Sequence, residues 1–138
     1  MKKKQLVLII FIFIFLTIGI TSIFHFYYTT LDIKELPMMV RVSDKLGIDV
    51  GTDMIRFGGL RPGGGSKRIF HLTNNHDIKV LIQFIPMGDI GDLVSISENN
   101  FIIQPEEHKT VDIGIGIPQD MPYGNYTGKL KVIIKRVN

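Results

Sequence analysis

Hydrophobic and polar residues follow one pattern near the N-terminus and another along the rest of the chain. Residues 6–24 form an apolar run that contains no charged side chain. A helix of this length extends roughly 28 Å at about 1.5 Å per residue, close to the ~30 Å hydrocarbon core of a bilayer. Beyond the run, apolar and polar residues alternate in short segments bounded by turn residues, which is typical of half-buried β-strands. The pattern predicts a transmembrane signal-anchor helix over residues 6–28, a spacer over 29–37 and a β domain over 38–138.

The alternation is clearest in two segments of the C-terminal third. Residues 110–117 alternate isoleucine or valine with aspartate and glycine, and residues 126–136 alternate apolar residues with lysine. Ile113 and Val132 are therefore expected to point inward on adjacent strands. The segment between them, 118–125, contains two prolines and a glycine and predicts the loop of a hairpin. Other strands are predicted at residues 39–43, 47–50, 54–57, 68–73, 78–85, 93–97 and 101–103. Short strands in this number favour an all-β fold, an antiparallel β-sandwich.

The turn residues between these strands resemble those of a known group of domains. The matching stretches are Phe57-Gly58 with Pro62-Gly63, the strand that ends at Asn74, and Pro105 to Pro118 followed by Gly124-Asn125-Tyr126-Thr127-Gly128. Together they resemble the prokaryotic surface Ig-like domains that include the NEW3-type and major-sperm-protein-like sandwiches. The resemblance covers about residues 48–136, and Glu106 stands where glycine is usual. It implies an Ig-like antiparallel β-sandwich that acts as a spacer or interaction module, without catalytic residues.

Excess positive charge is confined to the N-terminus. Lys2, Lys3 and Lys4 are three of the 16 basic residues, and the other 13 balance the 13 acidic ones. Because the positive flank of a span stays in the cytoplasm, residues 1–5 are predicted to be a cytoplasmic tail. The β domain is then extracytoplasmic, on a single-pass protein of the cell membrane. A neutral domain has no electrostatic footprint for nucleic acid, so the expected partners are the lipid bilayer, through residues 6–28, and an envelope protein.

Two other interpretations of the apolar run stay open. A cleaved signal peptide would end near residues 19–22, although the sequence has no Ala-x-Ala site there. A pilin-like subunit would pack the same helix into the core of a surface filament. In such leaders a small residue and a glutamate usually follow the basic residues, whereas here Gln5 and Leu6 follow Lys4. The mature N-terminus distinguishes these possibilities.

Few residues suggest chemistry. The chain has no cysteine, which excludes disulfides, thiolate metal sites and cysteine nucleophiles. Its serines lie in no nucleophile-elbow context, and its four histidines lack the spacing of a metal site. No catalytic residue, metal or cofactor is therefore expected. Asn125 begins an N-glycosylation sequon at a predicted turn, where an asparagine also serves simply as a turn residue.

One surface is a candidate for binding. If the strands 78–85, 110–117 and 126–136 are neighbours in one sheet, their outward residues form a shallow apolar trough. Its members are Leu81, Ile85, Gly114, Gly116 and Ile133. Glycine inside a strand often marks the close approach of another backbone, although single exposed apolar residues are also ordinary. We expect a non-enzymatic envelope protein that presents an Ig-like domain for protein interaction or structural positioning, with this face docking a protein partner or a second copy.

Overall fold

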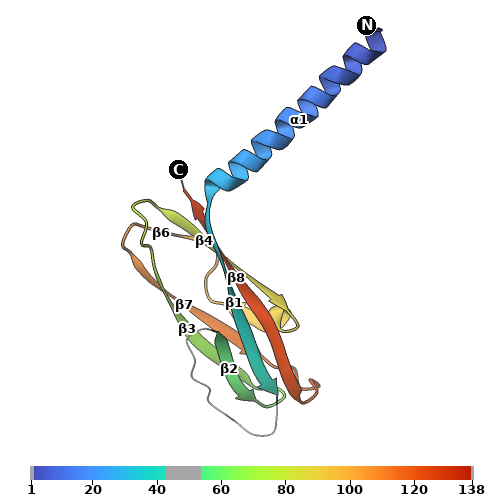
Figure 1. Ribbon diagram of the computed structural model, residues 1–138. Helices are drawn as coiled ribbons and strands as arrows, with labels where there is room; N and C mark the ends of the chain where they lie inside the picture. Colours follow the sequence, from blue (N-terminus) through green and yellow to red (C-terminus); the bar gives the residue numbers. More distant parts are fainter. Residues whose placement is uncertain (1, 43–53, 138) are drawn as a thin grey trace.

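The computed structural model describes residues 2–42 and 54–137. Within them, one long helix is followed by a domain built mostly of β-strands, as the alternation predicted (Figure 1). The helix is α1 (Lys3–Thr29), and a short 3-10 turn, η1 (Gly91–Leu93), precedes β5. The strands are β1 (Thr30–Val42), β2 (Ile55–Leu60), β3 (Gly65–Thr73), β4 (Val80–Gly88), β5 (Val94–Ile96), β6 (Phe101–Ile103), β7 (His108–Gly116) and β8 (Gly124–Arg136).

Helix α1 extends away from the β domain, and none of its residues is buried (Figure 1). It is long and apolar enough to cross a membrane. Its threonine hydroxyls are satisfied within the helix: Thr17 and Thr21 donate to carbonyl oxygens four residues earlier, at 2.9 and 2.7 Å. A hydroxyl bonded in this way exposes no unpaired donor to hydrocarbon. These two threonines of α1 are therefore compatible with a bilayer.

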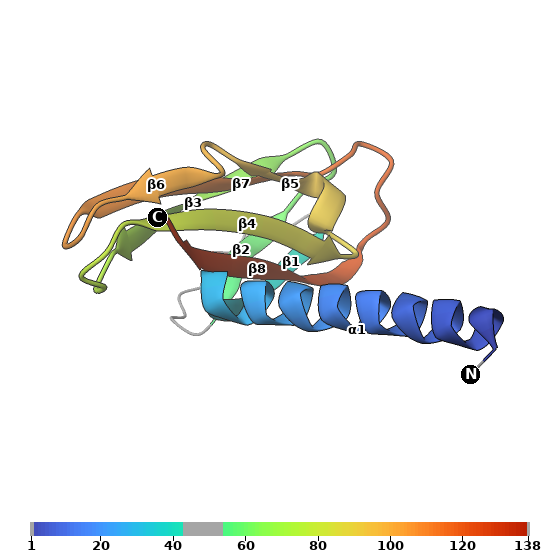
Figure 2. The same cartoon turned by 90° about the horizontal axis from the view of Figure 1, so that it is seen from above.

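The strands form two sheets, and β8 and β7 lie apart in the view from above (Figure 2). The larger has the order β2-β1-β8-β4-β6, and the smaller has the order β3-β7-β5. Strand β1 runs antiparallel to β8 but parallel to β2, so the five-stranded sheet is mixed. The prediction of a purely antiparallel fold is wrong at this pair.

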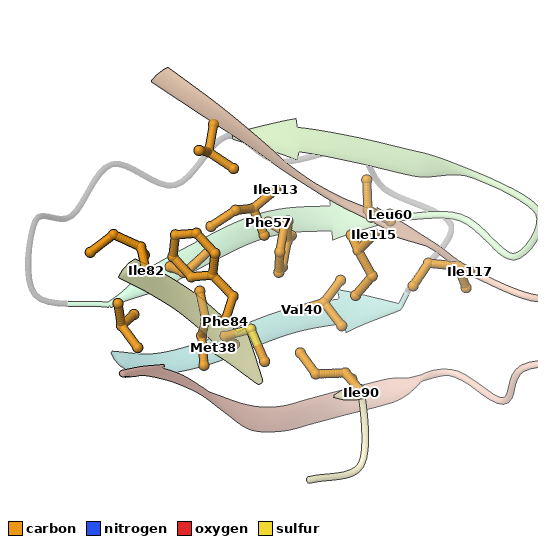
Figure 3. Packing of buried hydrophobic residues seen from close by; sticks show 14 of the residues in the cluster. Met38, Val40, Phe57, Leu60, Ile82, Phe84, Ile90, Ile113, Ile115 and Ile117 are labelled. Atoms are coloured by element: carbon orange, nitrogen blue, oxygen red, sulfur yellow. The ribbon is translucent and has the colours of Figure 1, made fainter. Parts of the chain in front are cut away.

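Buried side chains from both sheets form one hydrophobic cluster (Figure 3). The alternation predicted this set correctly: Ile113 of β7 and Leu130 of β8 are fully buried, and Val132 is 4% exposed. Strand β4 contributes Ile82 and Phe84 to the same cluster. At roughly 1.5–3 kcal/mol for each buried aliphatic or aromatic side chain, this cluster supplies the main stabilisation of a chain without disulfides.

The predicted hairpin of the two C-terminal strands is wrong. Strand β7 pairs with β3 and β5, whereas β8 pairs with β1 and β4 in the other sheet. The proline-containing segment after Ile117 therefore leads from one sheet to the other. Ile113 and Val132 are both buried, as predicted. They lie on strands of different sheets, however, and not on adjacent strands. In the immunoglobulin fold the last two strands share a sheet, so the strand order departs from the predicted Ig-like topology.

The chain has no spacer between helix and domain. Residues 29–37, predicted as one, are the last residue of α1 and the first part of β1. Their mixed charges suggested a linker, but these side chains lie on a strand that pairs with β8 along its whole length. The strand predicted at residues 47–50 lies outside the described residues.

A buried asparagine joins two turns at the end of the domain next to the helix. Asn74 is 3% exposed, and its Nδ2 donates to the carbonyl oxygens of Ile78 and Ile103 at 2.8 and 3.1 Å. Its Oδ1 accepts from the backbone N–H of His76 at 3.0 Å. Its main chain also pairs with that of residues 106–107. The turn after β3 is thereby fixed to β6 and to the turn that follows β6.

Candidate functional site

The structure divides the predicted trough between the two sheets. Leu81, Ile85 and Ile133 lie together on the outer face of the five-stranded sheet, because their neighbours in β4 and β8 point into the core. Gly114 and Gly116 lie on β7, in the three-stranded sheet. The prediction that Gly114 and Gly116 lie in one trough with the other three residues is therefore wrong. The error arose because strands 110–117 and 126–136 were predicted to pair with each other.

The two glycines have local surroundings of their own. A Cβ added to Gly114 would lie 2.8 Å from the Ser95 hydroxyl on β5, whereas one added to Gly116 would meet nothing within 4 Å. The outer face around them is mostly polar, with Lys67 and Asp112 in an ion pair at 3.0 Å. Ile69 is the large apolar residue there, at 61% exposed. This face does not offer an apolar surface.

The outer face of the five-stranded sheet is more apolar. Ile33 of β1 lies opposite Ile133 of β8, and Leu81 of β4 lies opposite Ile102 of β6. Gln83 of β4 lies opposite Ile133, and Ile85 is two residues farther along β4, so Ile85 and Ile133 are diagonal neighbours. Ile33 and Ile102 are 40% and 46% exposed, and the other three are half-buried. We call these five residues the apolar strip.

Two of the five were missed in the sequence. Ile33 lies in the segment predicted as a spacer, so it was assigned to no face. Ile102 lies between the inward residues Phe101 and Ile103, and that alternation was a sufficient signal to predict it as outward.

Lysines border the apolar strip. Lys131 and Lys135 of β8 lie opposite Ile85 and Leu81 in the ladder with β4. Farther along β8, Lys129 forms an ion pair with Glu35 of β1 at 3.2 Å. Lys131 and Lys135 lie on either side of Ile133 along β8, and Gln83 of β4 lies opposite it, so polar side chains alternate with the apolar ones on this face.

A groove extends this face toward the end of the domain that is distant from the helix. It measures about 430 Å³ and is lined in part by Pro37, Met39, Met54 and Met87. Methionine side chains are flexible and polarisable, so surfaces rich in them adapt to irregular partners. The groove and the apolar strip together occupy much of one face of the domain.

The remaining candidate residues are separate from this face. His71 and His76 are exposed, and the described part of the chain contains no group of three or more histidine, aspartate or glutamate side chains arranged to hold a metal. Asn125 is exposed near the start of β8, opposite Arg41. Its position leaves the sequon accessible, and its glycosylation stays a prediction.

The arrangement can bind by surface complementarity rather than by enclosing a small molecule. No family model matches the chain, and no curated protein or solved structure matches it. The function is therefore inferred from the helix, the two faces and their charges.

Proposed function

We propose that this chain is a non-enzymatic, single-pass membrane protein that holds a β domain outside the cytoplasm and binds another envelope protein. The observation that carries the proposal is the combination of an uncovered apolar helix with an apolar strip on one sheet face only. Both are apolar surfaces that the described chain leaves open. A bilayer fits the helix, and a protein fits the strip.

The helix supports the anchoring role. None of its side chains is buried against the domain, so the described chain leaves its apolar surface uncovered. Lys2, Lys3 and Lys4 lie at one end, and Tyr27 and Tyr28 lie at the other. Tyrosine favours the membrane interface, and lysine favours the cytoplasmic side. This distribution supports an N-inside, C-outside topology in the cell membrane.

The architecture of the β domain is partly consistent with the proposed similarity to prokaryotic surface domains. Two sheets with one core between them fit a β-sandwich, the architecture expected from the resemblance to prokaryotic surface domains. The strand order argues against a strict Ig-like topology, because β7 and β8 belong to different sheets. We therefore propose a sandwich of the surface-module kind, with a connection of its own between the last two strands.

The apolar strip supports protein binding. Soluble domains expose single apolar side chains freely, but several apolar side chains gathered on one sheet face mark an interaction site more often. The outer face of the three-stranded sheet is mostly polar, in contrast to the outer face of the five-stranded sheet. The strip and the methionine-lined groove distinguish one face from the other.

The first experiment tests topology. Protease added to intact cells should remove a C-terminal epitope tag while a cytoplasmic control protein stays intact. Protection of the tag in intact cells, with cleavage after permeabilisation, would show the reverse orientation.

The second experiment tests the docking face. Chemical cross-linking in native membranes should give a defined adduct with the full-length chain, and L81K/I133K should reduce its yield at least tenfold, roughly 1.4 kcal/mol or more. The matched control is I69K, an exposed isoleucine on the opposite face, which should leave the adduct unchanged. Equal adduct from all three proteins, or none from the parent chain, would contradict the proposal.

A filament subunit is the second candidate function. The same uncovered helix favours it, because such a helix can pack against copies of itself as readily as against lipid. Sequencing the mature N-terminus separates the two: processing near Lys4 and a polymeric state favour the filament. An intact Met1 and a membrane-bound monomer favour the anchor.

A further inference from the structure

A second concave surface lies where the helix meets the domain. It measures about 520 Å³ and lies between the last turns of α1 and the adjoining ends of β1, β4 and β8. The helix contributes Ser22, His25 and Phe26, and the strands contribute Leu81, Lys135 and Arg136. We call it the junction groove. Its walls combine basic, hydroxyl and apolar side chains.

The cations of this groove have no acidic partner. Four lysines elsewhere in the domain form ion pairs, with Asp32, Asp112, Glu98 and Glu35. Among the described residues, Lys135 and Arg136 form no ion pair and no hydrogen bond through their side chains. Arg136 instead stacks its guanidinium over the Tyr28 ring, 5.0 Å from the centroid. The positive charge of the groove is therefore uncompensated within the described chain.

Two buried polar atoms on the groove walls also lack partners. Within the described residues, neither Oγ1 of Thr30 nor Nε of Arg136 has a hydrogen-bond acceptor. Both are donors, and leaving a buried donor unpaired costs about 1–3 kcal/mol. An acceptor with several oxygens would satisfy this side of the groove.

The position of the groove along the helix indicates which acceptor. If Leu6 begins the hydrocarbon-spanning segment, Phe24 lies roughly 28 Å away, at the opposite surface of the hydrocarbon core. His25 and Phe26 then lie at the level of the outer headgroups, beside the interfacial Tyr28. The apolar Phe26 and Leu81 lie in the same groove as the cations. Charge at headgroup depth with apolar contacts beside it matches a phospholipid.

We propose that the junction groove binds the phosphate-bearing headgroup of an anionic phospholipid. Lys135 and Arg136 contact the phosphate at headgroup level, and Phe26 lies beside the glycerol region of the same lipid. The inference rests on the proposed anchoring role, because it requires α1 to span the bilayer. A lipid held here fixes the domain against the membrane surface.

The test uses the full-length protein and native mass spectrometry from mixed micelles of phosphatidylglycerol and phosphatidylcholine. The parent chain should retain one phosphatidylglycerol with a preference of about tenfold over phosphatidylcholine, and K135Q/R136Q should bring the two lipids to parity. The matched control is R41Q/K131Q, which removes two cations outside the groove that also form no ion pair among the described residues, and it should keep the preference. Parity in the parent chain, or equal loss in the control, would overturn the site.

Two further experiments distinguish lipid binding from phosphate binding, and the groove proposal from the anchoring proposal. Inorganic phosphate added as a competitor should leave the lipid adduct in place, and its replacement by a phosphate adduct would overturn the lipid assignment. Flotation with vesicles of phosphatidylcholine alone tests the anchor independently. A chain that floats without preferring phosphatidylglycerol contradicts only the groove, whereas a chain that does not float contradicts the anchoring role.

Discussion

Replacement of Asn74 by alanine should destabilise the domain strongly, and far more than the same change at its exposed neighbour Asn75. The substitution removes two hydrogen bonds donated by Nδ2 and one accepted by Oδ1. It also leaves the carbonyl of Ile103 buried without that donor. The net contribution of each bond is about 0.5–1.5 kcal/mol, so the expected loss is roughly 3 kcal/mol.

The measurement is thermal unfolding of the full-length protein in detergent, followed by circular dichroism. Because α1 stays helical in the micelle, the loss of signal reports on the β domain. A loss of about 3 kcal/mol should lower Tm by roughly 10 °C or more for a domain of this size. Hydrogen exchange should also rise first in the turns around residues 74–78 and 103–107.

The matched control is Asn75→Ala, the next residue in the same turn. Its side chain is exposed, so the variant should unfold within about 0.5 kcal/mol of the parent. If the two variants have equal Tm values, the buried asparagine does not hold the turns together and the reasoning is refuted.

Other predictions test the core and the sheet packing, with unfolding of the full-length protein as the assay. I113D would bury an unpaired charge at a fully buried position and should abolish cooperative folding. D112S removes one partly exposed ion pair and should cost less than about 1 kcal/mol. Similar stability of the two variants would mean that the strand register is shifted by one. G128A should destabilise by about 1–3 kcal/mol, because its Cβ would lie 2.6 Å from the Met87 carbonyl oxygen. G116A meets nothing within 4 Å and should be neutral, and a neutral G128A would refute the close approach of β4 and β8.

The sequence predicted which residues are buried better than which strands are neighbours. Alternation fixes the side of a strand on which a residue lies, so Ile113 and Val132 were correctly placed in the core. Nothing local distinguishes a loop that returns in the same sheet from one that crosses between layers, so the loop after Ile117 was misread. The parallel pairing of β1 and β2 is similarly a long-range property.

The candidate site divides in the same way. Leu81, Ile85 and Ile133 were correctly predicted as outward, because that follows from alternation. Joining them to glycines of β7 required knowledge of strand order, which period-2 patterns do not contain. The junction groove was not predictable, because it depends on the proximity of residues near 25 and near 135 in the folded chain.

The direct continuation of α1 into β1 has a mechanical consequence. Strand β1 lies between β2 and β8 and pairs with β8 from Thr30 to Val42. A pull on the domain therefore reaches α1 through a central strand. If the pull is along the strands, it loads the hydrogen bonds between β1 and β8 in shear, so that many must yield together rather than one after another. Tension on the domain would therefore reach α1 without a compliant linker to absorb it.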